Sequence, residues 1–205
     1  MKISLFAYSR QGRETGGNIM KALQNENIEG FTVKRLETES FSAIPEKSAE
    51  FYKEKFNSSE ALIFVGSCGI GVRLIAPYIK SKLTDPAVLV VDELGKFVIP
   101  LLSGHIGGAN ELAKKLAEKI GALPVITTAT DINGKFSVDS WAKAQGLQIS
   151  DMKKAKEISA AILEGNLGFC SPDRFLYPLS FYAQGPRAAP PKPDNRCKSP
   201  GFPQV

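Results

Sequence analysis

The only histidine of the chain lies in a short stretch of glycine and hydroxyl residues. His105 follows Ser103 and Gly104 and precedes Ile106-Gly107-Gly108-Ala109-Asn110. A loop histidine can act as a general acid or base near neutral pH, and neighbouring glycines let a ligand approach the backbone closely. The segment therefore predicts a reactive loop, although a histidine in a loop more often has a structural role.

A second glycine-rich stretch has the spacing GxxGxG and follows the apolar run Leu62–Val65. It reads Gly66-Ser67-Cys68-Gly69-Ile70-Gly71-Val72-Arg73. Backbone N–H groups and the guanidinium of Arg73 could together hold a carboxylate. Cys68 at a helix start could be a nucleophile, but a role as a small packed residue is favoured because no second histidine can serve as its base.

A third candidate, Ser9–Gly17, contains three glycines, two arginines and two hydroxyl residues. Such a loop before a helix suits an anion, although no nucleotide fingerprint is present and a tight turn is an equal alternative. In an open parallel sheet, ligands bind beyond the carboxyl ends of the strands. These loops are therefore expected to share one rim, completed by a hairpin turn at Asp92–Gly95 and by Thr127–Gly134, which either positions substrate or caps a turn.

The elements that must position these loops alternate between apolar runs and amphipathic stretches. Continuous apolar runs are typical of strands buried on both faces, and the alternation predicts a three-layer, doubly wound α/β fold with a mostly parallel, flavodoxin-like or Rossmann-like sheet. The expected strands are Ile3–Tyr8, Phe31–Leu36, Ala61–Val65, Ala87–Asp92, Phe97–Pro100 and Leu123–Thr127. The expected helices are Gly16–Asn27, Ser48–Phe56, Gly71–Lys80, Gly107–Ile120, Ser137–Ala144 and Met152–Leu163, with Gly121 as a helix stop and Asp151 as an N-cap.

The chain is expected to divide into three parts. Residues 1–145 form the α/β domain, residues 146–165 form a linking helix, and residues 166–205 form a proline-rich, irregular or disordered tail. The tail begins abruptly after the preceding helix, which leads to the hypothesis of a frameshifted or truncated end.

Composition narrows the function classes. The 205 residues carry a net charge of +5, with 43% hydrophobic and 23% charged residues, as in an ordinary globular protein. The lysines alternate with glutamates along helices, so no nucleic-acid partner is expected. No apolar run is long enough for a membrane span and no signal peptide is recognisable, so the protein is predicted to be cytoplasmic. Three cysteines without CxxC spacing argue against a structural metal.

The segment Leu102–Asn110, together with Gly66–Arg73 before it and Thr127–Asp131 after it, resembles the CbiG family of anaerobic cobalamin biosynthesis. The resemblance extends from about Met1 to Gly165. It implies hydrolysis of the δ-lactone of cobalt-precorrin-5A, with loss of acetaldehyde and formation of cobalt-precorrin-5B. A cobalt-containing tetrapyrrole is then the substrate, no cofactor or bound metal is expected, and homo-oligomers or contacts with pathway enzymes are conceivable partners.

The roles implied for single residues follow from what lactone opening requires. Water must be activated by a base and the oxyanion must be held by N–H donors, so His105 and Ser103 are predicted to be catalytic, with the amides around Gly107 and Gly108 as donors. The predicted substrate-binding residues are Arg10, Arg13, Gly16, Gly17, Gly66, Ser67, Cys68, Gly69, Gly71, Arg73, Gly104, Gly107, Gly108, Asn110, Thr128, Thr130 and Asp131.

Two alternatives stay open at this point. Family members usually continue into a C-terminal domain, and residues 165–205 do not resemble it, so the activity of this chain by itself is uncertain. The chain could instead be a non-catalytic tetrapyrrole-binding or partner-docking module in which His105 ligates cobalt or packs. A nucleotide-binding flavodoxin-like domain is disfavoured because the fingerprint motifs are absent.

Overall fold

A seven-stranded sheet organises the part of the chain that the structure describes, in the order β3-β2-β1-β4-β5-β6-β7. The computed structural model describes residues 1–134, 138, 141–142, 145–147 and 149–164. Every neighbouring pair of strands is parallel except β5 and β6. The strands are β1 (Lys2–Ala7), β2 (Asn27–Thr32), β3 (Ser42–Ala43), β4 (Ala61–Val65), β5 (Ala87–Val91), β6 (Phe97–Leu102) and β7 (Leu123–Pro124).

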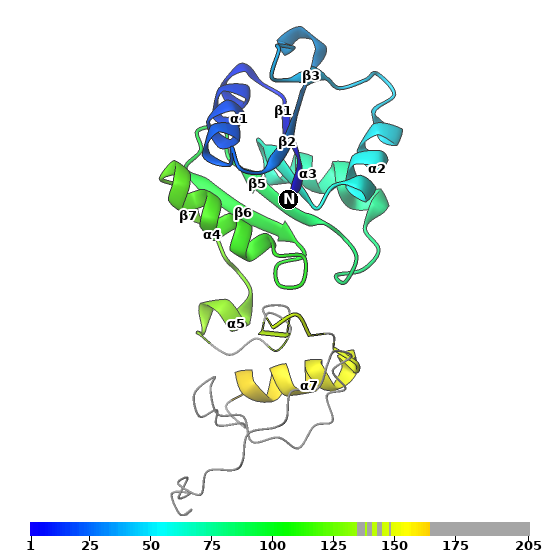
Figure 1. Cartoon of the computed structure of the whole chain (residues 1–205), viewed down its shortest axis with the longest axis vertical. Coiled ribbons are helices and arrows are strands. Elements are labelled where there is room, and N and C mark those ends of the chain that lie inside the picture. The colour runs from blue at the N-terminus through cyan, green and yellow to red at the C-terminus, as the bar shows by residue number, and fades with distance from the viewer. Residues whose placement is uncertain (135–137, 139–140, 143–144, 148, 165–205) are drawn as a thin grey trace, which may run out of the picture.

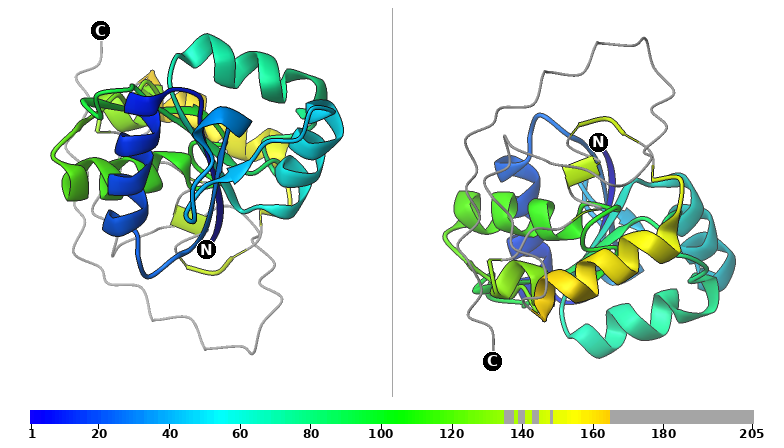
Figure 2. Two further views of the ribbon diagram at one scale, coloured as in Figure 1. Left: turned by 90° about the horizontal axis from the view of Figure 1, so that it is seen from above. Right: turned by 90° about the horizontal axis from the view of Figure 1, so that it is seen from below.

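Helices cover both faces of this sheet, which confirms the three-layer α/β prediction. Helices α1 (Arg10–Ala22) and α4 (Ala109–Ile120) pack on one face, and α2 (Ser48–Ser58) and α3 (Cys68–Ile75) pack on the other. Figure 2 shows the blue and green helices on one side of the strands and the cyan and teal helices on the opposite side. Further helical elements are α5 (Ala129–Ile132), α7 (Met152–Leu163) and the 3-10 turns η1 (Lys34–Leu36) and η2 (Ala76–Tyr78).

The central strands are buried on both faces, as their continuous apolar runs predict. All residues of β4 and β5 are buried. In β1, Leu5 contributes to the core under α1 and α4, while Phe6 contributes to the core under α2 and α3. Phe6 stacks on Phe64 with 4.9 Å between ring centroids. Burial of these large side chains, each contributing about 1.5–3 kcal/mol, fixes the middle of the sheet.

Two predicted loops are helical for most of their length. Helix α1 begins at Arg10, because Ser9 is its N-cap and its Oγ accepts a hydrogen bond from Gly12 N at 2.9 Å. The prediction of a loop at Ser9–Gly17 and a helix at Gly16–Asn27 was therefore wrong. Helix α3 likewise begins at Cys68, inside the GxxGxG segment, and ends at Ile75 before a 3-10 turn that contains Pro77.

Other boundaries also differ from the predictions. Strand β2 occupies Asn27–Thr32, so the expected strand at Phe31–Leu36 was misplaced and its end is the turn η1. Strand β6 extends two residues further than expected, whereas β7 keeps only the first two residues of Leu123–Thr127. Strand β3, with two residues, was not predicted.

The C-terminal helix α7 spans Met152–Leu163 as predicted, and the Asp151 side chain caps it by accepting from the amides of Lys153 and Lys154. Residues of α7 form a small third cluster with Val138 and Ile149. The expected helix at Ser137–Ala144 lies largely outside the described residues, as does the tail at 166–205, and the domain boundaries stay predictions. Within the described residues, no helix is long and apolar enough to cross a membrane.

The antiparallel strand β6 determines where the histidine loop lies. We call the edge where β1, β4 and β5 end the carboxyl edge, and the edge where they begin the amino edge. The end of β6 pairs with the beginning of β5, Leu102 opposite Val88, and β7 is parallel to β6. Both β6 and β7 therefore lead to the amino edge, roughly 15 Å from the carboxyl edge for strands of this length. In Figure 1 the arrow of β6 points toward the side of the molecule where α5 lies.

Candidate functional site at the amino edge

The loop between β6 and α4, residues 103–108, folds tightly on itself. Ser103 has a left-handed backbone with φ of 58°, and its Oγ donates a hydrogen bond to Asp85 O at 3.0 Å. A side chain at Gly107 would overlap the Cβ of Ser103 and come within 2.7 Å of its carbonyl oxygen. A side chain at Gly104 would come within 2.8 Å of Asn110 Oδ1. Both glycines are thus required for the close packing of this turn.

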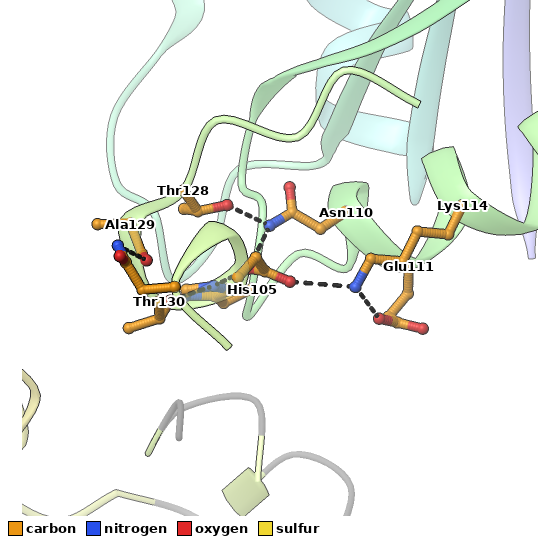
Figure 3. A network of polar contacts seen from close by, with 9 residues as sticks. His105, Asn110, Glu111, Lys114, Thr128, Ala129 and Thr130 are labelled. Carbon is orange, nitrogen blue, oxygen red and sulfur yellow. Dashed lines mark hydrogen bonds and ion pairs between the residues drawn. The ribbon is translucent and has the colours of Figure 1, made fainter. Parts of the chain in front are cut away.

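The turn brings His105 against the residues that follow β7. His105 Nε2 lies 2.8 Å from Asp131 Oδ2 and 3.2 Å from Thr130 Oγ1, and Figure 3 shows this network. The side chains of His105 and Asp131 are only 17% and 19% exposed. Because an ionised carboxylate only accepts hydrogen bonds, Nε2 carries the proton, and Nδ1 is then the basic nitrogen of the neutral ring. A histidine oriented by a carboxylate in this way suits general base chemistry.

Asp131 is held by two residues of α4 as well. Asn110 Nδ2 donates to Asp131 Oδ2 at 3.0 Å and to Thr128 Oγ1 at 2.6 Å, and Lys114 Nζ lies 3.1 Å from Asp131 Oδ1. Burial raises the pKa of the Asp131 carboxyl, but the hydrogen bonds from His105, Lys114 and Asn110 outweigh burial, so this pKa lies below its usual value. Asp131 is therefore ionised at neutral pH and can orient the imidazole.

The two amides expected to stabilise an oxyanion differ in their availability. Gly108 N donates to His105 O at 3.0 Å, so it serves the turn itself. The amide of Gly107 makes no hydrogen bond with any residue that the structure describes. Ser103 could act catalytically only if its hydroxyl left the hydrogen bond to Asp85 O. Of these two amides, only that of Gly107 is therefore a candidate donor to an oxyanion.

At the carboxyl edge, the beginning of α1 is occupied by the chain's own groups. Ser9 Oγ donates to Glu93 Oε1 at 2.5 Å, and Thr15 Oγ1 donates to Glu93 O at 2.5 Å. The turn Asp92–Gly95, a hairpin turn as predicted, thereby places a carboxylate at the N-terminus of α1. Arg13 Nη1 donates to Leu36 O at 3.0 Å, which ties this guanidinium to the 3-10 turn η1.

The glycines of α1 and α3 divide into packing positions and open positions. A side chain at Gly16 would come within 2.9 Å of Leu5 Cδ2, and one at Gly71 within 3.1 Å of Val90 Cγ2. Gly17, Gly66 and Gly69 have no atoms within 4 Å of an added Cβ. These contacts explain why glycine is found at positions 16 and 71: the helices pack closely against the sheet there, and no ligand is needed to account for either glycine.

The other predicted site residues near the carboxyl edge do not converge on a shared group or site. Cys68 packs against the core under α2 and α3. The side chains of Arg10 and Arg73 are exposed and form no hydrogen bond or ion pair with the residues described. Within the same described ranges, no three His, Cys, Asp or Glu side chains form a group that could hold a metal.

The structure therefore separates the predicted site residues into two groups. It gathers Ser103, Gly104, His105, Gly107, Gly108, Asn110, Thr128, Thr130 and Asp131 around one turn at the amino edge. It places Arg10, Arg13, Gly16, Gly17, Gly66, Ser67, Cys68, Gly69, Gly71 and Arg73 on or before the two helices that begin at the carboxyl edge. The expectation of a single shared rim was wrong, because β6 runs antiparallel to β5.

Sequence reasoning missed Lys114. This lysine is four residues after Asn110 in α4, so both side chains lie on the same side of the helix and reach the same carboxylate. The spacing was visible in the sequence, but its meaning depends on Asp131, which comes from a different element.

The fold and this site define a doubly wound α/β protein with an aspartate-oriented histidine at the amino edge of its sheet. Residues 50–131 match the family described as cobalamin synthesis G N-terminal, in agreement with the resemblance of the chain to the CbiG family. His105, Asn110, Lys114 and Asp131 all lie inside the matched segment.

Two relatives of known name are both cobalt-precorrin-5A hydrolases. The chain is 46% identical over 125 residues to a cobalt-precorrin-5A hydrolase of Salmonella typhimurium, covering 61% of this chain and 36% of that protein. It is 45% identical over 108 residues to a cobalt-precorrin-5A hydrolase of Priestia megaterium, covering 53% and 29%. The chain thus spans about a third of the length of these relatives.

A solved structure is also similar to the chain. It is that of a cobalamin biosynthesis protein G homolog from Sulfolobus solfataricus, with 27% sequence identity and a TM-score of 0.49, covering 80% of this chain and 46% of that one.

Proposed function

We propose that this chain carries the hydrolytic site that opens the δ-lactone of cobalt-precorrin-5A. The observation that supports this most is the His105–Asp131 pair, 2.8 Å apart and mostly buried, inside the segment that matches the family. The relatives that share this segment are named cobalt-precorrin-5A hydrolases. The substrate is a tetrapyrrole that brings its own cobalt.

The proposed chemistry is general base catalysis. His105 Nδ1 takes a proton from a water molecule, and the resulting hydroxide attacks the lactone carbonyl carbon. The Gly107 N–H stabilises the negative charge that develops on the carbonyl oxygen. The ring C–O bond then breaks, the proton passes from His105 to the departing oxygen, and the products are a carboxylic acid and an alcohol. Acetaldehyde is released from the opened product in a following step.

Asp131 keeps Nε2–H oriented through this cycle and stabilises the imidazolium that forms when Nδ1 is protonated. Lys114 and Asn110 hold Asp131 in turn. Substrate carboxylates would be attracted by the net positive charge of the chain, whereas Arg10 and Arg73, at the opposite edge of the sheet, have no part in this proposal. Attack by the Ser103 hydroxyl on the lactone carbonyl carbon, in place of attack by water, is the alternative in which Ser103 has its predicted catalytic role.

A non-catalytic tetrapyrrole-binding module is the second candidate. In this module the residues around His105 would bind the tetrapyrrole without opening its lactone, and His105 would ligate cobalt or pack. Homo-oligomers, contacts with other enzymes of the pathway and a cytoplasmic location stay predictions.

The test is anaerobic incubation of the purified chain with cobalt-precorrin-5A, with acetaldehyde release and substrate binding measured in parallel. Release that disappears in His105→Ala supports the hydrolase. Binding without release would support the module, and absence of both would contradict the two candidates together. Lys115→Met is a suitable control, because Lys115 lies on the same helix and pairs with Glu26, away from the histidine.

A further inference from the structure

We propose that Lys114 is a positioning residue that locks the Asp131 carboxylate in the orientation that His105 requires. This inference rests on the proposed function, in which His105 is the base. Lys114 Nζ binds Asp131 Oδ1 at 3.1 Å, while His105 Nε2 binds Asp131 Oδ2 at 2.8 Å. Each carboxylate oxygen thus has its own partner, so rotation about the Cβ–Cγ bond would break an ion pair.

The helix that carries Lys114 is firmly fixed to the sheet. Leu112, Ala113, Leu116 and Ala117 of α4 are buried in the core that α4 shares with α1. The position of the Lys114 backbone is therefore set by packing, while its ammonium group reaches past the helix surface to Asp131. Asn110, one turn earlier, is 4% exposed and binds the same carboxylate, so α4 contacts Asp131 twice.

A lysine is well suited to this role because its charge is permanent at neutral pH. The titratable groups that face Asp131 are His105 from the turn after β6 and Lys114 from α4, and Glu111 faces Lys114 from the same helix at 3.2 Å. The Glu111 side chain is 81% exposed, so solvent screens it. The hydrogen bond to Asp131 raises the pKa of Lys114, and that from Lys114 helps to lower the pKa of Asp131. Lys114 thus helps, together with His105 and Asn110, to keep Asp131 ionised.

A positioning role differs from a purely structural role in its consequences. Without Lys114, Asp131 Oδ1 loses its partner, so the carboxylate is held only through Oδ2, its pKa rises and Nε2–H of His105 is less well oriented. The expected kinetic effect is a reduction of kcat of about tenfold, as is common when an outer partner of a reactive group is lost. KM should change little because Lys114 is not proposed to touch the substrate. The acid limb of the pH profile should move to higher pH.

The experiment compares Lys114→Met, Lys114→Arg and the control Lys115→Met, all in the chain as it exists. Lys115 is exposed to a similar extent, 50% against 45%, on the same helix, but pairs with Glu26. The Asp131 carboxyl is titrated by carbon-13 NMR in the free protein, and acetaldehyde release is then measured against pH. Thermal unfolding of each variant shows whether it is folded.

A higher Asp131 pKa in Lys114→Met that is reversed in Lys114→Arg and absent in Lys115→Met would support the inference. An Asp131 titration that is the same in Lys114→Met and Lys115→Met would overturn it, whether or not the chain turns over substrate. Absence of acetaldehyde release from the unaltered chain would contradict the proposed function separately. The NMR titration and the turnover assay therefore distinguish the failure of one proposal from the failure of the other.

Discussion

The polar groups at the two edges of the sheet are used differently. At the carboxyl edge, Ser9, Thr15 and Glu93 bind one another, and a carboxylate of the chain itself lies at the beginning of α1. At the amino edge, His105 and Asp131 from two different segments meet at 2.8 Å. Glycine-rich sequence occurs at both edges, so glycine content by itself does not distinguish a reactive turn from a packed helix.

The glycines themselves show what distinguishes the two edges. Gly16 and Gly71 bring a helix close to the sheet, which is a matter of packing. Gly107 lets the turn after β6 close over Ser103 and thereby presents His105 to Asp131. The comparison supports the proposal that the chemistry takes place at the amino edge, while the glycines and polar groups of the carboxyl edge contribute to packing.

The largest effect should come from removing the histidine. We expect His105→Ala to reduce turnover of cobalt-precorrin-5A by about 10²- to 10⁴-fold, the usual contribution of a general base. The matched change at the other edge, Arg73→Ala, should reduce kcat less than about threefold, because Arg73 is an exposed residue at the edge opposite to His105. Acetaldehyde release under saturating substrate measures both. A larger loss of kcat in Arg73→Ala than in His105→Ala would reverse the comparison.

One glycine substitution at each edge should have a different effect on the free energy of unfolding. Gly107→Ala forces a side chain against the Ser103 backbone, and we expect it to destabilise the protein by about 1–3 kcal/mol. Gly69→Ala places a methyl group in open space on helix α3 and should be neutral or stabilising by up to about 1 kcal/mol. Urea unfolding measures both variants. Weaker substrate binding by Gly69→Ala would show that the GxxGxG segment holds the ligand after all.

Two substitutions of Ser103 should distinguish the stability cost of its left-handed backbone from the stability contribution of its hydroxyl hydrogen bond. Ser103→Ala keeps the left-handed backbone and loses the bond to Asp85 O, a cost of about 1 kcal/mol. Ser103→Gly loses the same bond but removes a left-handed penalty of roughly 1 kcal/mol, so its stability should stay near that of the unaltered chain.

Activity of the same two variants tests the role of the hydroxyl. If water attacks the lactone directly, Ser103→Gly keeps turnover within a few-fold of the unaltered chain. Loss of turnover in both variants, measured on folded protein, would instead make Ser103 a catalytic residue.

The smallest effect concerns pH. The pKa of Asp131 is lower in the folded chain than the value of about 3.9 expected when it is unfolded. Its contribution to stability is therefore present above about pH 4 and is lost as pH falls through the lower folded value. The difference in unfolding free energy between the unaltered chain and Asp131→Asn should shrink as pH falls below about pH 4. A difference that grows with acidity would show that this carboxyl is not stabilised in its ionised form.

The sequence predicted the middle of the fold well because burial on both faces leaves a clear pattern. The apolar runs of β1, β4 and β5 are confirmed within a residue or two, and so are the N-cap Asp151 and the C-terminal glycine Gly121 of α4. Strand β3 has only two residues, too few for any periodicity. The beginnings of α1 and α3 were missed because their glycines suggested loops, whereas Ser9 and the packing of Gly16 and Gly71 favour helix.

The position of the histidine turn was implied in the sequence but was not deduced. The turn at Asp92–Gly95 was predicted to be a hairpin, and a hairpin makes the next strand antiparallel, so the turn after β6 must lie at the amino edge. The contacts of Asp131 with His105, Asn110 and Lys114 could not be predicted in this way. They depend on β7 running parallel to β6 and on α5 following closely, which is tertiary structure with no local signal.

The most direct test of the account is to locate the substrate on the two edges. Nitrogen-15-labelled chain is titrated with cobalt-precorrin-5A under anaerobic conditions, and the amide signals are followed. The account predicts that the signals of Gly104, Gly107 and Thr130 change first and most strongly, while those of Gly12 and Gly16 in α1 stay constant. Strong changes confined to residues 66–73 and the beginning of α1 would contradict it and would place the site at the carboxyl edge.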